Sequence, residues 1–179
     1  MASIHPTVNI SGLARRLVFD KLLTEQQAQH AFQDALKKRA HFVSYLVENK
    51  VLGSEEIAIA ASQEFGVPLF NLDAVDMEVA PIKLVQEKLI RTHHALPLYK
   101  RGNRLFLAVS DPTNLQGLDE IKFHTGLTTE AVVVEEAKLV QAIEKALQDK
   151  QSSMNEMLDA DLENLDIALD DSEAKQDDG

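Results

Sequence analysis

Apolar side chains in residues 10–65 recur every three to four positions, which is the spacing of one face of an α-helix. Residues 17–24 can be laid over residues 46–53 at an offset of 29 positions, and Leu, Val, Lys and Leu are then identical at matching places. Each copy predicts a helix, a turn and a second helix. The sequence therefore predicts two helical hairpins that bury their apolar faces against each other.

Capping signals mark the ends of these helices. Thr24 with Gln27 forms the capping box of a helix start, and Gly66 before Pro68 is a stop signal. The side chains that we expect to face inward are Leu13, Leu17, Val18, Ala28, Ala31, Phe32 and Ala35 in the first hairpin, and Phe42, Leu46, Val47, Ile57, Ala60, Ala61 and Phe65 in the second.

From Val67 onward, short strands are predicted to alternate with helices. In chain order we expect a strand at 69–72, a helix from Pro81, a β-hairpin of 96–100 with 104–110, a helix ending at Gly126, a strand at 131–134, and a last helix with Leu139, Val140, Ile143 and Leu147 inward. This order resembles a split β-α-β sandwich. The predicted fold class is therefore α+β.

Charge is concentrated at one end of the chain. Residues 151–179 hold ten of the 29 acidic residues but only one of the 18 basic residues, and no aromatic residue. Such a segment cannot bury enough apolar surface to offset its conformational entropy, so a mostly disordered tail is expected. In a second interpretation it folds on a partner groove, because Met154, Leu158, Leu162, Leu165 and Leu169 share one helical face.

These patterns divide the chain into an N-terminal arm (1–9), a tandem helical repeat (10–66), an α/β sandwich (67–149) and an acidic tail (150–179). There is no cysteine and no apolar run of a secretory signal near Met1, so a cytoplasmic location is expected. The seven glycines form neither a phosphate loop nor a dinucleotide-binding turn, and this chain is therefore not expected to hydrolyse ATP.

Residue types that could carry catalysis or bind metal occur without the required geometry. His93 and His94 are neighbours, and on a helix they would point about 100° apart, so they cannot chelate one ion. Ser110, Asp111 and His124 are the residue types of a hydrolytic triad, but no G-x-S-x-G turn presents the serine. We predict no nucleophile and no metal site.

The first hairpin carries a candidate surface for a protein partner. Phe19 interrupts the polar side of its helix, and its counterpart in the second copy is Glu48, so a core position is not expected. Large apolar and arginine side chains are the usual anchors of interfaces. The predicted partner-binding residues are Arg15, Arg16, Phe19, Leu22 and Leu23. The alternative for Phe19 is a half-buried contact with the neighbouring hairpin.

Basic residues cluster at 15–16 and 37–39, with Lys21 and Lys50 at equivalent turns of the two copies. They could cradle an anion. Two short clusters with acidic residues nearby are more typical of a solvated helix face than of a nucleic-acid-binding stripe. We therefore predict no nucleic-acid partner.

The segments 63–72, 96–114 and 121–127 carry a family resemblance, above all the hairpin followed by Ser-Asp-Pro-Thr-Asn at 110–114. Over roughly residues 10–149 the chain resembles the N-terminal domain of PilB-type type IV pilus assembly ATPases and the related MshEN-like domain of type II secretion ATPases. The resemblance implies a regulatory and docking domain that precedes a hexameric motor for pilus extension and twitching motility. The tail would then be a linker, and ATP and magnesium are expected only in that motor domain.

The same resemblance implies partners. They are a PilZ-type adaptor protein, the chain's own ATPase domain and the pilus platform protein at the inner face of the bacterial inner membrane, without direct membrane insertion. The parent protein is expected to be a homohexamer.

Some members of this family bind cyclic diguanylate through the repeat, where each copy opens with Arg-Leu-Gly, has a glycine before the turn and ends with glutamine. The corresponding positions here are Gly12, Leu13, Ala14, Lys21 and Ala35 in the first copy, and His41, Phe42, Val43, Lys50 and Glu64 in the second. Because the arginines and glycines are missing, we expect a docking domain. A direct cyclic diguanylate receptor is the alternative.

Overall fold

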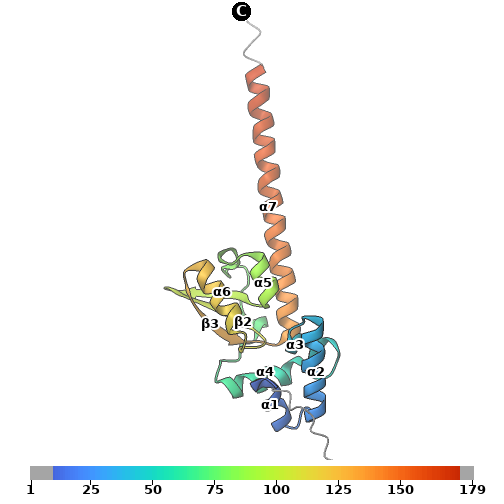
Figure 1. Cartoon of the computed structure of the whole chain (residues 1–179). Coiled ribbons are helices and arrows are strands. Elements are labelled where there is room, and N and C mark those ends of the chain that lie inside the picture. The colour runs from blue at the N-terminus through green and yellow to red at the C-terminus, as the bar shows by residue number, and fades with distance from the viewer. Residues whose placement is uncertain (1–9, 174–179) are drawn as a thin grey trace, which may run out of the picture. The chain divides into compact units, whose positions relative to one another are not determined.

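The computed structural model describes residues 10–173 and the side chains of residues 10–165. Two compact units divide the chain, at residues 1–143 and 144–179. The predicted arm, residues 1–9, lies outside the described residues. The first unit contains the four-helix repeat and a small sheet with its helices (Figure 1), so the predicted α+β fold class is confirmed.

The helical repeat consists of α1 (Gly12–Phe19), α2 (Glu25–Lys38), α3 (Phe42–Glu48) and α4 (Ser54–Phe65). The predicted capping box of α2 is present. The Gln27 amide donates to Thr24 Oγ1 at 3.2 Å, and the Thr24 amide donates to Gln27 Oε1 at 2.9 Å. Helix α4 ends at Gly66, whose φ of 63° is the left-handed conformation that favours glycine.

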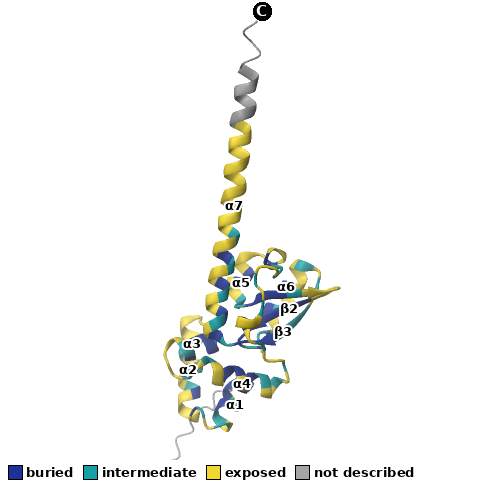
Figure 2. Ribbon diagram, turned by 180° about the vertical axis from the view of Figure 1, so that it is seen from behind, coloured by how far each residue is buried: buried dark blue, intermediate teal, exposed yellow. Residues whose placement is uncertain are grey.

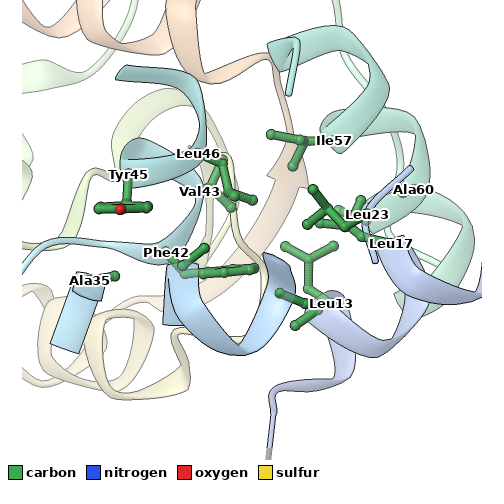
Figure 3. Close-up of a cluster of buried hydrophobic side chains, with 14 of the residues drawn as sticks. Leu13, Leu17, Leu23, Ala35, Phe42, Val43, Tyr45, Leu46, Ile57 and Ala60 are labelled. Atoms are coloured by element: carbon green, nitrogen blue, oxygen red, sulfur yellow. The ribbon is translucent and has the colours of Figure 1, made fainter. Parts of the chain in front are cut away.

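The four helices share one apolar core (Figure 3). The described core includes Leu13, Leu17, Leu46 and Ile57, all of them fully buried. Burying a side chain of this size stabilises the fold by about 1.5 to 3 kcal/mol. Of the residues predicted to face inward, only Val18, Phe32, Val47 and Phe65 are partly buried, and these four pack against the core from its edge.

The sheet has three strands in the order β1-β2-β3. The strands are β1 (Leu96–Arg101), β2 (Arg104–Val109) and β3 (Thr128–Val133). Strands β1 and β2 form the predicted antiparallel hairpin, and β3 pairs with β2 in parallel, which needs the crossover through α6 (Leu115–Thr125). Helix α6 ends at Gly126, as predicted.

The predicted strand at 69–72 is reduced to an isolated bridge between Leu69 and Val133. The Val133 amide donates to the Pro68 carbonyl and the Phe70 amide donates to the Val133 carbonyl, both at 2.8 Å. Pairing stops there because the Asn71 side chain accepts from the Asp73 amide and starts a 3-10 turn, Leu72–Ala74.

The predicted helix after Pro81 is interrupted. It consists of a 3-10 turn, Ile82–Leu84, and the helix α5 (Glu87–His93). The extended backbone of Val85 separates the two, and its side chain is buried. The helix is therefore interrupted at a residue whose side chain is buried in the core.

Helix α7 (Glu136–Glu173) begins in the first unit and continues through the described part of the second. Leu139, Ile143 and Leu147 are buried as predicted, whereas Val140 is 39% exposed. The prediction for Val140 was wrong because apolar residues at spacing four already fill the inward face, and Val140 lies about 100° away from Leu139.

The sequence predicts a mostly disordered tail, but the structure describes it as helical as far as Glu173. All side chains from 151 to 165 are exposed, as the yellow part of α7 in Figure 2 shows. A helix that is already nucleated extends at little cost through residues such as Met, Leu, Glu and Ala, which have high helix propensity. Residues 174–179 lie outside the described residues.

Because these side chains are exposed, truncation after Lys150 should leave folding of the remaining chain almost unchanged. We expect the midpoint of thermal unfolding, measured by circular dichroism, to shift by less than about 2 °C. As a control for sensitivity, Leu139→Ala removes a fully buried side chain and should cost about 2 to 5 kcal/mol. A drop of more than about 4 °C on truncation would show that the tail contributes to the stability of the domain.

Candidate functional site

Phe19, the central residue of the predicted partner surface, is 79% exposed at the C-terminal end of α1. It therefore makes no half-buried contact with the neighbouring hairpin. Arg15, one turn earlier on the same helix, is also exposed, and Leu22 in the following turn is half-buried. These three side chains are available to a partner to different degrees, with Phe19 the most accessible of the apolar ones.

Arg16 and Leu23, two other predicted partner-binding residues, have structural contacts of their own. Leu23 is buried in the core of the repeat. Arg16 Nε donates to Asp20 Oδ2 at 2.8 Å, and its Nη atoms donate to Gln63 Oε1 at 3.0 Å and to Glu64 Oε2 at 3.4 Å. The Asp20 hydrogen bond is the main cause that raises the pKa of Arg16. Arg16 thus connects α1 to the end of α4.

The two turns of the repeat have the same backbone conformation. Lys21 and Lys50 are both left-handed, with φ of 60° and 55°. In the first turn the Leu22 amide donates to Leu17 O at 3.0 Å, and in the second the Val51 amide donates to Leu46 O at 2.9 Å. The two copies of the internal repeat therefore also share the backbone hydrogen bond that closes the turn.

A lysine at such a position costs roughly 1 to 2 kcal/mol that a glycine would avoid. Both lysines are exposed. Related sequences that bind cyclic diguanylate have glycine at these two turn positions. Here lysines adopt the left-handed conformation instead.

The remaining positions of the dinucleotide motif are buried or engaged. Leu13, Ala14, Ala35, Phe42 and Val43 are buried. Gly12 has no side chain, and a Cβ atom there would lie 3.4 Å from the Phe65 ring.

The two polar positions of the motif have partners within the chain. His41 Nε2 lies 2.9 Å from the Thr92 carbonyl oxygen, and Glu64 accepts from Arg16. Apart from Lys21 and Lys50, these positions therefore present no arginine or lysine for a phosphate.

A buried polar cluster joins the repeat to the sandwich, and sequence reasoning missed it. Glu136, the first residue of α7, is only 2% exposed. Ser44 Oγ of α3 donates to Glu136 Oε1 at 2.6 Å, and His94 Nδ1 at the end of α5 lies 3.0 Å from the same oxygen. The available signal was Ser44, a polar residue in the apolar run 42–46.

His93 and His94 point to different partners. His93 Nε2 lies 2.6 Å from Glu120 Oε2 of α6, whereas His94 lies beside Glu136 and its ring is 5.1 Å from the ring of His41. The left-handed backbone of His94, with φ of 47°, ends α5 between them. The two histidines thus connect the end of α5 to α6 through Glu120 and to α7 through Glu136. Among the side chains that the structure describes, residues 10–165, no group of acidic and histidine side chains is suited to a metal ion.

The cluster shifts the titration of both of its ionisable groups. Burial by itself would raise the pKa of Glu136, but the favourable interactions with His94, Ser110 and Ser44 outweigh it, so the pKa is lowered. The hydrogen bond to Glu136 raises the pKa of His94, against the opposite effect of burial. The pair is therefore favoured as imidazolium and carboxylate.

This pair makes domain stability depend on pH. Because the pKa of His94 is raised, its interactions stabilise the fold when the pH is below 6.5, the ordinary pKa of histidine. That contribution is lost as the pH rises through the pKa of His94 in the folded protein. Because the pKa of Glu136 is lowered, its interactions stabilise the fold when the pH is above 4.5, the ordinary pKa of glutamate. That contribution is lost as the pH falls through the pKa of Glu136 in the folded protein. Both contributions are present between these two ordinary values.

We expect Glu136→Gln to lower the free energy of unfolding by about 1 to 3 kcal/mol, with the largest loss between about pH 4.5 and 6.5. Urea unfolding of wild type, Glu136→Gln, His94→Gln and the double variant across pH measures the coupling. Each single variant should lose most of what the double variant loses in that window. Wild-type and variant curves that run parallel across pH would contradict an ionised pair.

Comparison with known proteins defines the class of this domain. Residues 65–153 match the family model of the MshEN domain, which covers the sandwich and the start of the tail but not the repeat. The structure is similar to MshE solved with cdg, with a TM-score of 0.56 and 23% identity over 75% of this chain and 97% of that one. It also resembles the N-terminal domain of XpsE, with a TM-score of 0.52 and 19% identity over 74% of this chain and 92% of that one.

The relatives extend over the repeat as well. The type IV pilus assembly ATPase PilB of Pseudomonas aeruginosa is 37% identical over 174 residues, which is 97% of this chain and 31% of PilB. PilB of Acinetobacter baylyi is 35% identical over 78% of this chain and 24% of that protein. The chain belongs to the PilB-type N-terminal domains. It spans about a quarter to a third of the length of these relatives.

Among the described residues, no helix combines the length and the apolar character needed to cross a membrane.

Proposed function

We propose that this chain is a non-catalytic regulatory and docking domain of a type IV pilus assembly ATPase, and that it binds a PilZ-type adaptor through the exposed side of α1. Binding of the adaptor would then control pilus extension. The observation that carries the proposal is Phe19, which is 79% exposed beside exposed Arg15 on a repeat whose core is otherwise well packed. An exposed aromatic side chain beside an arginine is the usual composition of an interface anchor.

The remaining parts of the proposal rest on the PilB relatives. The domain would act in the cytoplasm at the inner face of the inner membrane, next to its own ATPase domain and the pilus platform protein. ATP and magnesium would bind the motor domain, and the motor would be a homohexamer. The 35–37% identity to PilB proteins across the repeat and the sandwich supports this placement.

Replacement of Phe19 by alanine should weaken adaptor binding by about 2 kcal/mol, or roughly 30-fold, because Phe19 would be a buried anchor in the complex. Isothermal titration with the PilZ-type adaptor of the same cell measures this. Arg16 is left unchanged, since its contacts with Gln63 and Glu64 make its replacement a structural change.

Phe123 provides the matched control. It is 85% exposed on α6 of the sandwich, so Phe123→Ala removes an equally large exposed ring away from the proposed surface. Affinity should then remain at the wild-type value. Equal affinities for wild type and Phe19→Ala, with an unchanged circular dichroism spectrum, would place the interface elsewhere.

A direct cyclic diguanylate receptor is the second candidate. The matching geometry of the two turns and the exposed lysines Lys21 and Lys50 favour it, since two cations at equivalent turns could pair with two phosphates. Against it, His41 and Glu64 are engaged within the chain and Gly12 offers no side chain. The docking function is therefore the better supported of the two.

Titration of the chain with cyclic diguanylate separates the candidates. We expect no saturable heat up to about 100 μM ligand, because the arginines of the motif are missing. Binding with a dissociation constant in the low micromolar range, abolished in Lys21→Ala with Lys50→Ala, would establish the receptor function instead. Lys37→Ala with Lys38→Ala is the control, because these lysines lie at the end of α2 and outside the motif.

A further inference from the structure

The second unit carries a helical face that no described residue covers. On α7, the side chains Met154, Met157, Leu158, Leu162 and Leu165 are between 56% and 67% exposed. Single exposed apolar side chains are common on protein surfaces, but here five large ones occur within 12 successive positions. A contiguous apolar face of this kind is typical of an interaction surface. We call these five residues the tail stripe.

An acidic residue lies inside the tail stripe. At about 100° per residue, the side chains follow one another around the helix within an arc of about 140°. Their order around the arc is Met157, Asp161, Met154, Leu165, Leu158 and Leu162. Any surface that covers the stripe therefore also covers or closely approaches the carboxylate of Asp161.

The charges around the stripe have one sign. Every charged residue from 151 to 173 is acidic, and Glu156, Asp159 and Glu163 are spaced three or four residues apart, where like charges repel. Helix α7 also has no basic residue in its last turn to balance the negative end of the helix dipole. Nothing in this stretch of the helix neutralises its own charge.

The charges around the tail stripe determine which kind of partner can cover it. A second copy of the helix, paired in parallel, would place Asp161 against Asp161, and an antiparallel copy would bury the carboxylate against apolar or acidic side chains. Burying a carboxylate without a cation is strongly unfavourable. An occupant with lysine or arginine beside an apolar floor would satisfy both the stripe and its charges.

We propose that the tail stripe is a docking helix for a partner groove with an apolar floor and a basic rim, and that Asp161 prevents pairing with a second copy of this chain. The partner is identified only by this chemistry. The proposal concerns the tail and does not depend on adaptor binding at α1.

Methyl resonances give a direct test with the full chain. The chain has four methionines, of which Met154 and Met157 belong to the stripe and Met77 lies in the first unit. The probe is a synthetic amphipathic helix with leucines on one face and lysines on its rim, and a leucine-glutamate peptide of the same pattern is its counterpart. We expect the lysine peptide to shift the Met154 and Met157 methyl signals, leaving Met77 unchanged, and the glutamate peptide to shift none.

Variants separate the apolar and the charged contributions. Leu158→Gln with Leu162→Gln should weaken binding of the lysine peptide at least tenfold, whereas Ser152→Gln with Ala160→Gln, on the opposite face, should leave it unchanged. Raising the salt concentration from about 0.1 to 0.5 M should weaken binding several-fold. No shift at Met154 and Met157, or equal shifts with both peptides, would overturn the proposal.

Sedimentation tests the role of Asp161. Wild type should remain monomeric at about 100 μM, and Asp161→Leu, which completes the apolar face, should self-associate. Dimers of wild type that are lost in Leu158→Gln with Leu162→Gln would identify a second copy as the occupant and overturn the basic partner. Monomers in both wild type and Asp161→Leu would overturn the assigned role of Asp161.

Discussion

A carboxylate that is almost fully buried must be paired, and in this domain the partners of Glu136 come from both halves of the first unit. Its oxygen accepts from Ser44 of the repeat and lies beside His94 at the end of α5, so this one side chain of α7 contacts two other elements. Loss of His94 would leave the buried charge of Glu136 without its cation. The start of α7 is therefore fixed by residues from both the repeat and the sandwich.

The two copies of the helical repeat have the same turn conformation but carry different side chains around it. Its two turns have matching hydrogen bonds and matching left-handed residues, although those residues are lysines. The side chains at the other motif positions pack in the core or bind within the chain. Such a scaffold is suited to presenting a surface, and on α1 the residue presented is Phe19.

The two proposed docking surfaces, on α1 and on the tail stripe, differ in charge. Phe19 lies beside a cationic residue, Arg15, whereas every charged residue from 151 to 173, around the tail stripe, is acidic. Partners of opposite charge would suit the two surfaces.

The sequence by itself determined the elements whose signals are local. The four helices of the repeat, the hairpin of β1 with β2 and the stop at Gly126 follow from periodicity, capping and turn residues, which act over a few positions. It also indicated the family, through the hairpin and the Ser-Asp-Pro-Thr-Asn segment at 110–114. The exposure of Phe19 was predicted because the repeat allowed its position to be compared with that of Glu48.

Only the tertiary structure decided which residues meet across long sequence separations. Ser44 and Glu136 are 92 positions apart, and Arg16 and Glu64 are 48 apart, so no local pattern pairs them. The strand at 69–72 shortened to one bridge because the side chain of Asn71, in the same segment, accepts a hydrogen bond from the Asp73 amide. Hydrogen-bonding and ionisable groups are satisfied by whichever partner the fold brings near, and that choice is made by packing of the apolar core rather than by the local sequence.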